Sequence, residues 1–134
     1  MRVQRLNPDG LHVTPGYHHV TVVEAGRMAH LAGQCPLDED GGLVGAGDLH
    51  AQVDQVVGNA LVALRAVGAE PVDVVRSHIW VASAERADLA AVWTRLRESA
   101  LAEALSTACT LVGVAQLGYP GQLVELDLTA SLSA

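Results

Sequence analysis

The sequence contains no phenylalanine and no lysine, and only 3% of its 134 residues are aromatic. Half of the residues are nevertheless hydrophobic, so the core has to be built from valine, leucine and alanine through many small contacts. Such a composition is typical of a globular protein and excludes a disordered chain. A chain of this length fits one core, and we expect a single domain over residues 1–134.

Positive charge is scarce and scattered. Eight arginines face fifteen acidic residues, which gives a net charge of −7. Because phosphate binding draws on clustered positive charge, nucleic acid is not an expected partner. No apolar run approaches the roughly 18 residues that cross a bilayer, and the first residues lack the apolar stretch of a signal peptide. We therefore expect no membrane association and a cytoplasmic protein.

The cysteines and histidines give no metal-binding pattern. Cys35 and Cys109 lie far apart and belong to no CxxC or Cys/His spacing of the kind that binds zinc. The adjacent His18 and His19 point to opposite sides of a predicted strand, and the other histidines show no ligand spacing. The sequence predicts reduced thiols and no metal site.

Glycine and proline group into short turns between segments of regular periodicity. A helix over residues 48–67 is indicated by Asp48 as N-cap, by an apolar stripe that begins at Leu49, and by Gly68 after its end. Residues 86–104 repeat helical spacing. Strands are predicted over residues 17–24, 27–32, 73–81, 108–116 and 122–132, the first two as a hairpin. The predicted order is β-β-α-β-α-β-β.

The strand over residues 73–81 carries apolar side chains on both faces. Val75, Ile79 and Val81 alternate to one side, and Val74 and Trp80 alternate to the other. Two helices cover only one face of a sheet of four or five strands. We therefore expect the other face to be buried against further copies of the chain.

Five segments follow one another in the order and spacing of a known family: PGYHHV (15–20), LAGQCPLD (31–38), GLVGAGDLHAQVDQVVGNALVAL (42–64), VGAEPVDVVRSHIWV (67–81) and LVELDLTA (123–130). In these segments the chain resembles the RidA family, also called YjgF, over nearly its whole length. The resemblance implies an α+β, chorismate-mutase-like fold, with two helices on one face of a mixed β-sheet. It also implies a homotrimer with a central barrel and three intersubunit clefts that bind small metabolites.

Active members of that family are enamine and imine deaminases that need neither metal nor cofactor. The resemblance implies a catalytic role for Glu125, whose position in the deaminases orients the attacking water, and substrate contacts from Tyr17 and from Gly33 and Gln34. A carboxylate near an electrophilic C=N carbon takes a proton from water as a general base. An outward polar strand face explains Glu125 equally well, and interface packing explains Tyr17.

Three positions depart from the deaminase pattern. The family's Pro-Ala-Arg element falls on residues 107–109, so Cys109 stands where a guanidinium holds a substrate carboxylate. Trp93 stands at a position that is often Asn, and Gly-Pro-Tyr has become Pro-Gly-Tyr. These changes favour a less anionic or more apolar ligand. For Cys109, a buried filler, a pocket-lining group and a nucleophile remain open, and Trp93 fits either core or pocket.

Two functions remain open at this point. The first is binding of a small metabolite with hydrolysis of an imine, enamine or related substrate through water held by Glu125, and with little arginine-dependent deamination of 2-imino acids. The alternative is a non-catalytic metabolite-binding or protein-interaction module. RNA cleavage, described for some relatives, is disfavoured by the charge of −7.

Overall fold

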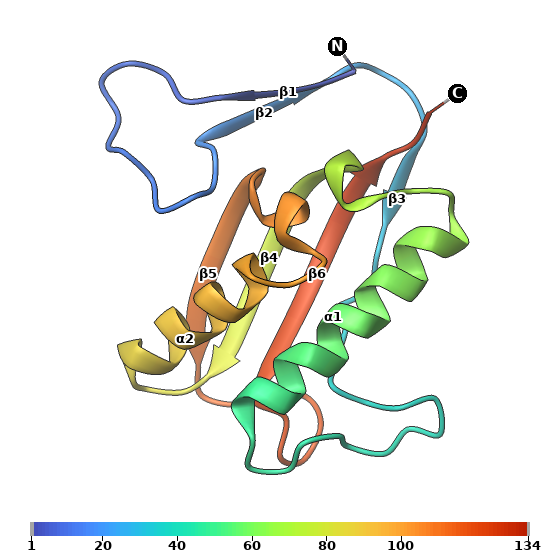
Figure 1. Ribbon diagram of the computed structural model, residues 1–134, viewed down its shortest axis with the longest axis vertical. Coiled ribbons are helices and arrows are strands. Elements are labelled where there is room, and N and C mark those ends of the chain that lie inside the picture. The colour runs from blue at the N-terminus through green and yellow to red at the C-terminus, as the bar shows by residue number, and fades with distance from the viewer. Residues whose placement is uncertain (1, 134) are drawn as a thin grey trace.

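The computed structural model describes residues 2–133. Its strands are β1 (Val3–Leu6), β2 (Val20–Val23), β3 (Met28–His30), β4 (Val74–Ala82), β5 (Ala108–Val114) and β6 (Val124–Ser131), and its helices are α1 (Leu49–Ala66) and α2 (Arg86–Arg97). Short 3₁₀ turns cover Pro71–Asp73 and Ala102–Leu105. Figure 1 shows α1 and α2 side by side on one face of a sheet, with β1 and β2 forming a separate ribbon.

The main sheet has the strand order β3-β6-β4-β5. Strands β4 and β5 are parallel, and β6 is antiparallel to both β3 and β4. The parallel pair is connected through α2, which packs back onto the sheet as a crossover helix does. The predicted α+β class, with a mixed sheet and two helices on one face, is confirmed.

Helix α1 forms where the sequence predicts it. The Asp48 carboxylate accepts a hydrogen bond from the Ala51 amide at 3.1 Å, and Gly68 adopts a φ of +75° just after the helix end. The stripe that includes Val53, Val56 and Leu64 is fully buried against the sheet. Burial of this stripe, rather than helix propensity alone, stabilises the element.

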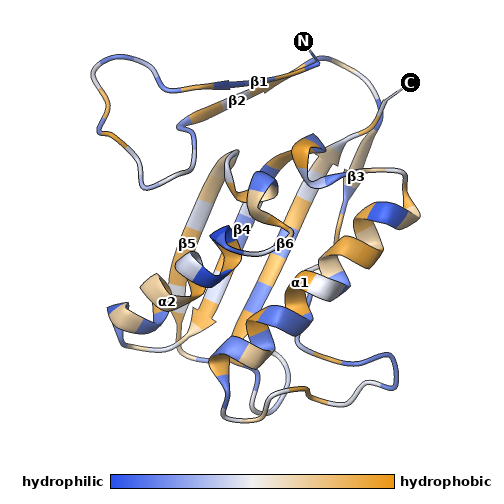
Figure 2. Ribbon diagram, viewed as in Figure 1, coloured by the Kyte–Doolittle hydropathy of each residue, from blue (hydrophilic) through white to orange (hydrophobic). Residues whose placement is uncertain are grey.

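Strand β6 lies in the middle of the sheet and alternates between the two faces. Val124, Leu126 and Leu128 are buried under the helices, and Glu125 and Asp127 project from the uncovered face. Figure 2 shows the same alternation of apolar and polar residues along β6. The period of two therefore places Glu125 on the open face of the sheet.

The open face is less apolar than the sequence predicts. A bulge between Val74 and Arg76 shifts the alternation of β4, so Val74 joins the core with Ile79 and Val81. Trp80 does lie on the open face, where it stacks on His78 at a centroid distance of 5.6 Å. The placement of Val74 on the face opposite to Ile79 and Val81 is wrong, because a simple alternation ignores the bulge.

The predicted hairpin of residues 17–24 and 27–32 is also wrong. Strand β2 pairs with β1, which the sequence analysis did not predict, and β3 pairs with β6. Arg5 attaches β1 to the rest of the molecule by donating hydrogen bonds to the carbonyls of Val72 and Val74 at 3.1 and 3.0 Å. A turn between two strands that are neighbours in sequence suggests that they pair with each other. The pairing is decided instead by the competition with all other strands of the fold.

Helix α2 is shorter than the predicted span of 86–104. It ends at Arg97, where the Ser99 hydroxyl donates to the Leu96 carbonyl at 2.6 Å and accepts from the Leu101 amide at 3.1 Å. A serine side chain that binds nearby backbone groups in this way competes with the helical hydrogen bonds. The apolar residues beyond it, Leu101 and Leu105, still reach the core from a turn and a 3₁₀ segment.

Candidate functional site

Glu125 and Gly33 are in direct contact. The Glu125 carboxylate projects from β6 and lies against Gly33, so closely that a Cβ on Gly33 would overlap Oε2. The Gln34 backbone N–H donates to the Leu126 carbonyl at 2.7 Å, and the Leu126 N–H donates to the Gln34 carbonyl at 3.1 Å. Residues 33 and 34 are therefore held beside β6 as an additional strand-like segment. The structure brings together three of the residues selected from the sequence: Glu125, Gly33 and Gln34.

Two residues that the sequence analysis missed bind the Glu125 carboxylate. The Gln122 amide donates to Oε1 at 3.1 Å, and the Cys35 thiol lies 3.5 Å from the same oxygen. Burial, and after it the negative charge of Glu125, raises the pKa of Cys35. Cys35 was visible inside the LAGQCPLD segment, but nothing in the sequence indicates that Gln122 approaches Glu125.

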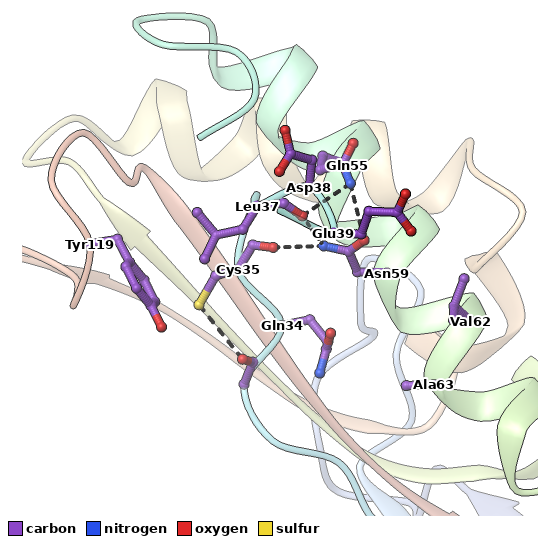
Figure 3. Close-up of a pocket in the computed structure, with 11 residues that line it drawn as sticks. Gln34, Cys35, Leu37, Asp38, Glu39, Gln55, Asn59, Val62, Ala63 and Tyr119 are labelled. Carbon is purple, nitrogen blue, oxygen red and sulfur yellow. Dashed lines mark hydrogen bonds between the residues drawn. The ribbon is translucent and has the colours of Figure 1, made fainter. Parts of the chain in front are cut away.

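A cavity of about 660 Å³ lies beside this contact, between residues 33–39 and α1. Its walls, drawn in Figure 3, are formed by Gly33, Gln34, Cys35, Leu37, Asp38, Glu39, Gln55, Asn59, Val62, Ala63 and Tyr119. The Asn59 amide donates to the carbonyls of Cys35 and Leu37, both at 2.9 Å. Asn59 therefore fastens the 33–39 segment to α1 (Figure 3).

Tyr17, Trp93 and Cys109 meet in a second, smaller pocket of about 320 Å³. Besides these three residues it is lined by Pro15, Ala90 and Leu111. The Tyr17 and Trp93 rings meet edge to face, with centroids 6.4 Å apart and planes at 77°. The pocket is almost wholly apolar and suits a ring or an aliphatic group better than a charged one.

Cys109 lies half-buried in this second pocket, packed against the core from β5. Burial raises the pKa of Cys109, and the nearby Ser77 hydroxyl and Arg76 charge offset part of that rise. The group is therefore a neutral thiol at neutral pH, which is a poor nucleophile. The His19 ring hydrogen-bonds to the His12 carbonyl at 2.8 Å, and His18 hydrogen-bonds to Ser106, so both rings are engaged elsewhere.

Arg97 provides a guanidinium at the rim of the second pocket. It donates to the Pro15 carbonyl at 2.8 Å and lies 6.0 Å from the Trp93 ring centroid, within the range of a cation–π contact. The Trp93 indole donates to the same carbonyl at 3.2 Å. Gly16, at a φ of +129°, has no side chain where the guanidinium packs. Arg97 thus holds the Pro-Gly-Tyr turn, and the sequence analysis missed it.

A single chain does not bring Glu125 and Cys109 together. Cys109 faces α2 from the edge strand β5, and Glu125 leaves β6 on the opposite face of the sheet, with β4 between the two strands. The residues predicted for one site therefore occupy two places: Glu125, Gly33 and Gln34 in the first, and Tyr17, Trp93 and Cys109 in the second.

Within residues 2–133 there is neither a cluster of metal ligands nor a membrane-spanning helix. No three histidine, cysteine or acidic side chains in that range group closely enough to hold a metal ion. None of the helices in the same range combines the length and the apolar character that crossing a membrane requires.

Residues 11–132 match the family model described as Endoribonuclease L-PSP. Among solved structures, a protein of unknown function of the conserved Rid protein family, YyfB from Yersinia pestis, is 35% identical with a TM-score of 0.89, and the match covers 98% of this chain and all of that one. No curated protein matches the sequence significantly.

More distant structures share the fold. The Rid family protein YyfA from Yersinia pestis is 22% identical over 90% of both chains, with a TM-score of 0.69. A protein from Entamoeba histolytica described as a putative endoribonuclease L-PSP is 22% identical over 97% of this chain and 99% of that one, with a TM-score of 0.67. The family model and the 35% identity over 98% of the chain show that the chain belongs to the RidA, or YjgF, family.

Proposed function

We propose that the protein is a cytoplasmic homotrimer that binds a small metabolite in clefts between its subunits. In this proposal it hydrolyses an imine, enamine or related substrate through water positioned by Glu125. The ligand carries an apolar group and little negative charge, and deamination of free 2-imino acids is weak or absent. The apolar pocket that places Cys109 against Tyr17 and Trp93 is the single observation that carries the choice of ligand.

The apolar pocket argues against an anionic substrate. A guanidinium at position 109 would give a carboxylate two charge-assisted hydrogen bonds, each worth roughly 1.5–3 kcal/mol. A neutral thiol supplies neither. Arg97 does not replace it in this arrangement, because it lies outside the lining of the apolar pocket and packs on Gly16 and the Pro15 carbonyl. The net charge of −7 further disfavours an anion.

The Glu125 contact supports water activation. Its carboxylate lies on the uncovered face of the sheet, and Oε2 takes the space that a side chain at position 33 would fill. General-base help from a positioned carboxylate contributes typically 10²–10⁴ in rate. Because one chain separates Glu125 from the apolar pocket, a shared site requires a second copy, which supports the homotrimer.

The test is an assay in which an amino-acid oxidase generates 2-imino acids in situ. We expect the wild-type protein to accelerate release of the 2-oxo acid little, and Cys109→Arg to lower KM by about tenfold or more, since it restores a carboxylate clamp. Cys109→Ala serves as the matched control and should resemble wild type. Wild-type acceleration equal to that of an active family member would contradict the proposed ligand class.

A non-catalytic binding or interaction module is the alternative. The two readings separate at Glu125, because a binder has no need of a group that activates water. For imines without a carboxylate, generated in situ from isoamylamine or phenethylamine by a flavin-dependent amine oxidase, Glu125→Gln should abolish hydrolysis while the apolar pocket still binds ligand. Equal rates in wild type and variant would favour the binding module. RNA cleavage, suggested by the family description, remains disfavoured because no lysine and only eight arginines are present.

A further inference from the structure

We propose that Cys35 and Gln122 are positioning residues that hold Oε1 of Glu125, so that Oε2 is the oxygen presented to the ligand. This inference rests on the proposed role of Glu125. Neither residue was assigned a role from the sequence, and they come from different parts of the chain. They converge on one oxygen atom, Oε1 of Glu125.

Gln122 is a buried donor that is held by several hydrogen bonds. Its side chain is almost fully buried, with 3% exposed. The amide oxygen accepts from the Tyr119 backbone N–H at 3.1 Å, and Nε2 donates to the Val124 carbonyl and to Glu125 Oε1, both at 3.1 Å. A primary amide has two N–H bonds, and both are used. Because the amide oxygen accepts from the Tyr119 N–H, the nitrogen of the amide faces Glu125.

Cys35 supplies the second contact. Its sulfur lies 3.5 Å from Glu125 Oε1 and 3.6 Å from the Gly33 carbonyl. A thiol has one hydrogen to donate, and an ionised carboxylate is a stronger acceptor than a neutral carbonyl. The backbone of Cys35 is itself held by Asn59 of α1, through the 2.9 Å bond to its carbonyl (Figure 3). Helix α1 therefore helps to fix the position of the Cys35 thiol.

The two carboxylate oxygens consequently differ. Oε1 lies between two donors, and Oε2 lies against Gly33, where the missing side chain leaves the space it occupies. A carboxylate fixed at one oxygen directs the other toward a single place, and such preorganisation lowers the cost of reaching the reactive geometry. Oε2 is the oxygen that would take the proton from water.

The contact between Cys35 and Glu125 is tested by the reactivity of the Cys35 thiol with iodoacetamide at pH 8. The Cys109→Ser background leaves Cys35 as the one cysteine. Glu125→Gln removes the neighbouring negative charge, so we expect the alkylation rate to rise by about three- to tenfold. Gln122→Leu should lower the rate, because the Glu125 carboxylate loses the amide N–H that offsets part of its negative charge beside the thiol. Glu39→Gln is the matched control, since Glu39 lines the same cavity without a hydrogen bond to Cys35.

By the clamp we mean the contacts of Cys35 and Gln122 with Glu125 Oε1. Opposite changes in Glu125→Gln and Gln122→Leu, with no change in Glu39→Gln, would support it. An unchanged rate in Glu125→Gln would overturn it, whether or not Gln122→Leu folds. This measurement needs no turnover. A protein that hydrolyses no imine but shows the expected thiol reactivities would disprove the proposed function and leave the clamp standing.

The positioning role is tested with an imine without a carboxylate, generated in situ from isoamylamine by a flavin-dependent amine oxidase. Cys35→Ala should lower kcat by about three- to tenfold with KM nearly unchanged, the loss expected for one orienting hydrogen bond. Cys35→Ser keeps a donor and should restore most of kcat. A merely structural thiol would give equal losses in both variants. A kcat of Cys35→Ala equal to that of wild type would overturn the positioning role.

Discussion

At the scale of single residues, close contacts explain departures from the family pattern that looked like simple losses. Gly16 replaces proline before Tyr17, and the structure places the Arg97 guanidinium where a side chain at position 16 would lie. The Pro-Gly-Tyr turn and Arg97 are therefore one arrangement. Cys109 likewise lies in a pocket whose other walls are apolar, so the missing guanidinium and the apolar walls suit each other.

Gly16→Ala should destabilise the protein by about 1–3 kcal/mol, because a φ of +129° strains any residue with a Cβ. The added methyl group also displaces Arg97. Arg97→Ala in the same chain should recover part of the loss, since it removes the overlap but not the backbone strain. Urea unfolding of both single variants and the double variant measures the coupling. Full additivity would show that Arg97 does not pack on Gly16.

At the scale of elements, the fold depends on how the two helices are joined to each other and to the sheet. Apart from the shared core, an ion pair joins them: the Arg95 guanidinium binds both oxygens of Asp54 at 2.9 and 2.7 Å. This hydrogen-bonded guanidinium holds the pKa of Asp54 below its ordinary value of 3.8. Both side chains are largely exposed, so the contribution to stability is small.

Because the folded-state pKa of Asp54 is lowered, the ion pair stabilises the protein above pH 3.8 and loses its effect as the pH falls through the folded-state value. Asp54→Asn should therefore lower the free energy of unfolding slightly at pH 7, and the difference from wild type should shrink below about pH 4. Urea midpoints at several pH values and low salt measure it. Asp40→Asn is the control. A constant difference down to pH 2 would contradict the assignment.

At the scale of the whole molecule, the sheet separates the two halves of the candidate site. Glu125 with Gly33 and Gln34 lies toward one edge, and Cys109 with Tyr17 and Trp93 lies at the β5 edge. Apolar residues such as Val20, Val22 and Val112 are exposed on a single chain, and Trp80 lies on the open face. These features support assembly with other copies, although the open face also carries the hydrogen-bonded pair His78 and Asp127.

If each cleft takes one half from each of two subunits, two inactive variants should rescue each other. Glu125→Gln disables the first half, and Ala90→Trp fills the apolar pocket of the second. Randomly mixed trimers, formed by co-expression, should regain about one quarter of wild-type imine hydrolysis, because each cleft needs both intact halves. Sedimentation checks the assembly. Recovery no greater than that of the separate variants, or a stable monomer at micromolar concentration, would contradict the shared cleft.

Residue patterns by themselves determined the period of each main element. The stripe of α1, its Asp48 cap and the alternation that puts Glu125 on the polar face of β6 come from short-range spacing. These properties repeat every two or 3.6 residues and are therefore readable along the chain. The selection of Glu125, Gly33 and Cys109 is what the family resemblance implies.

Only the tertiary structure decided which segments meet. It paired β2 with β1 instead of β3, moved Val74 into the core through a bulge, and brought Cys35 and Gln122 to the same oxygen of Glu125. It also placed Glu125 and Cys109 on opposite faces of the sheet. Such contacts join residues up to 90 positions apart. They depend on the competition of all segments for hydrogen bonds and apolar burial, which no local pattern records.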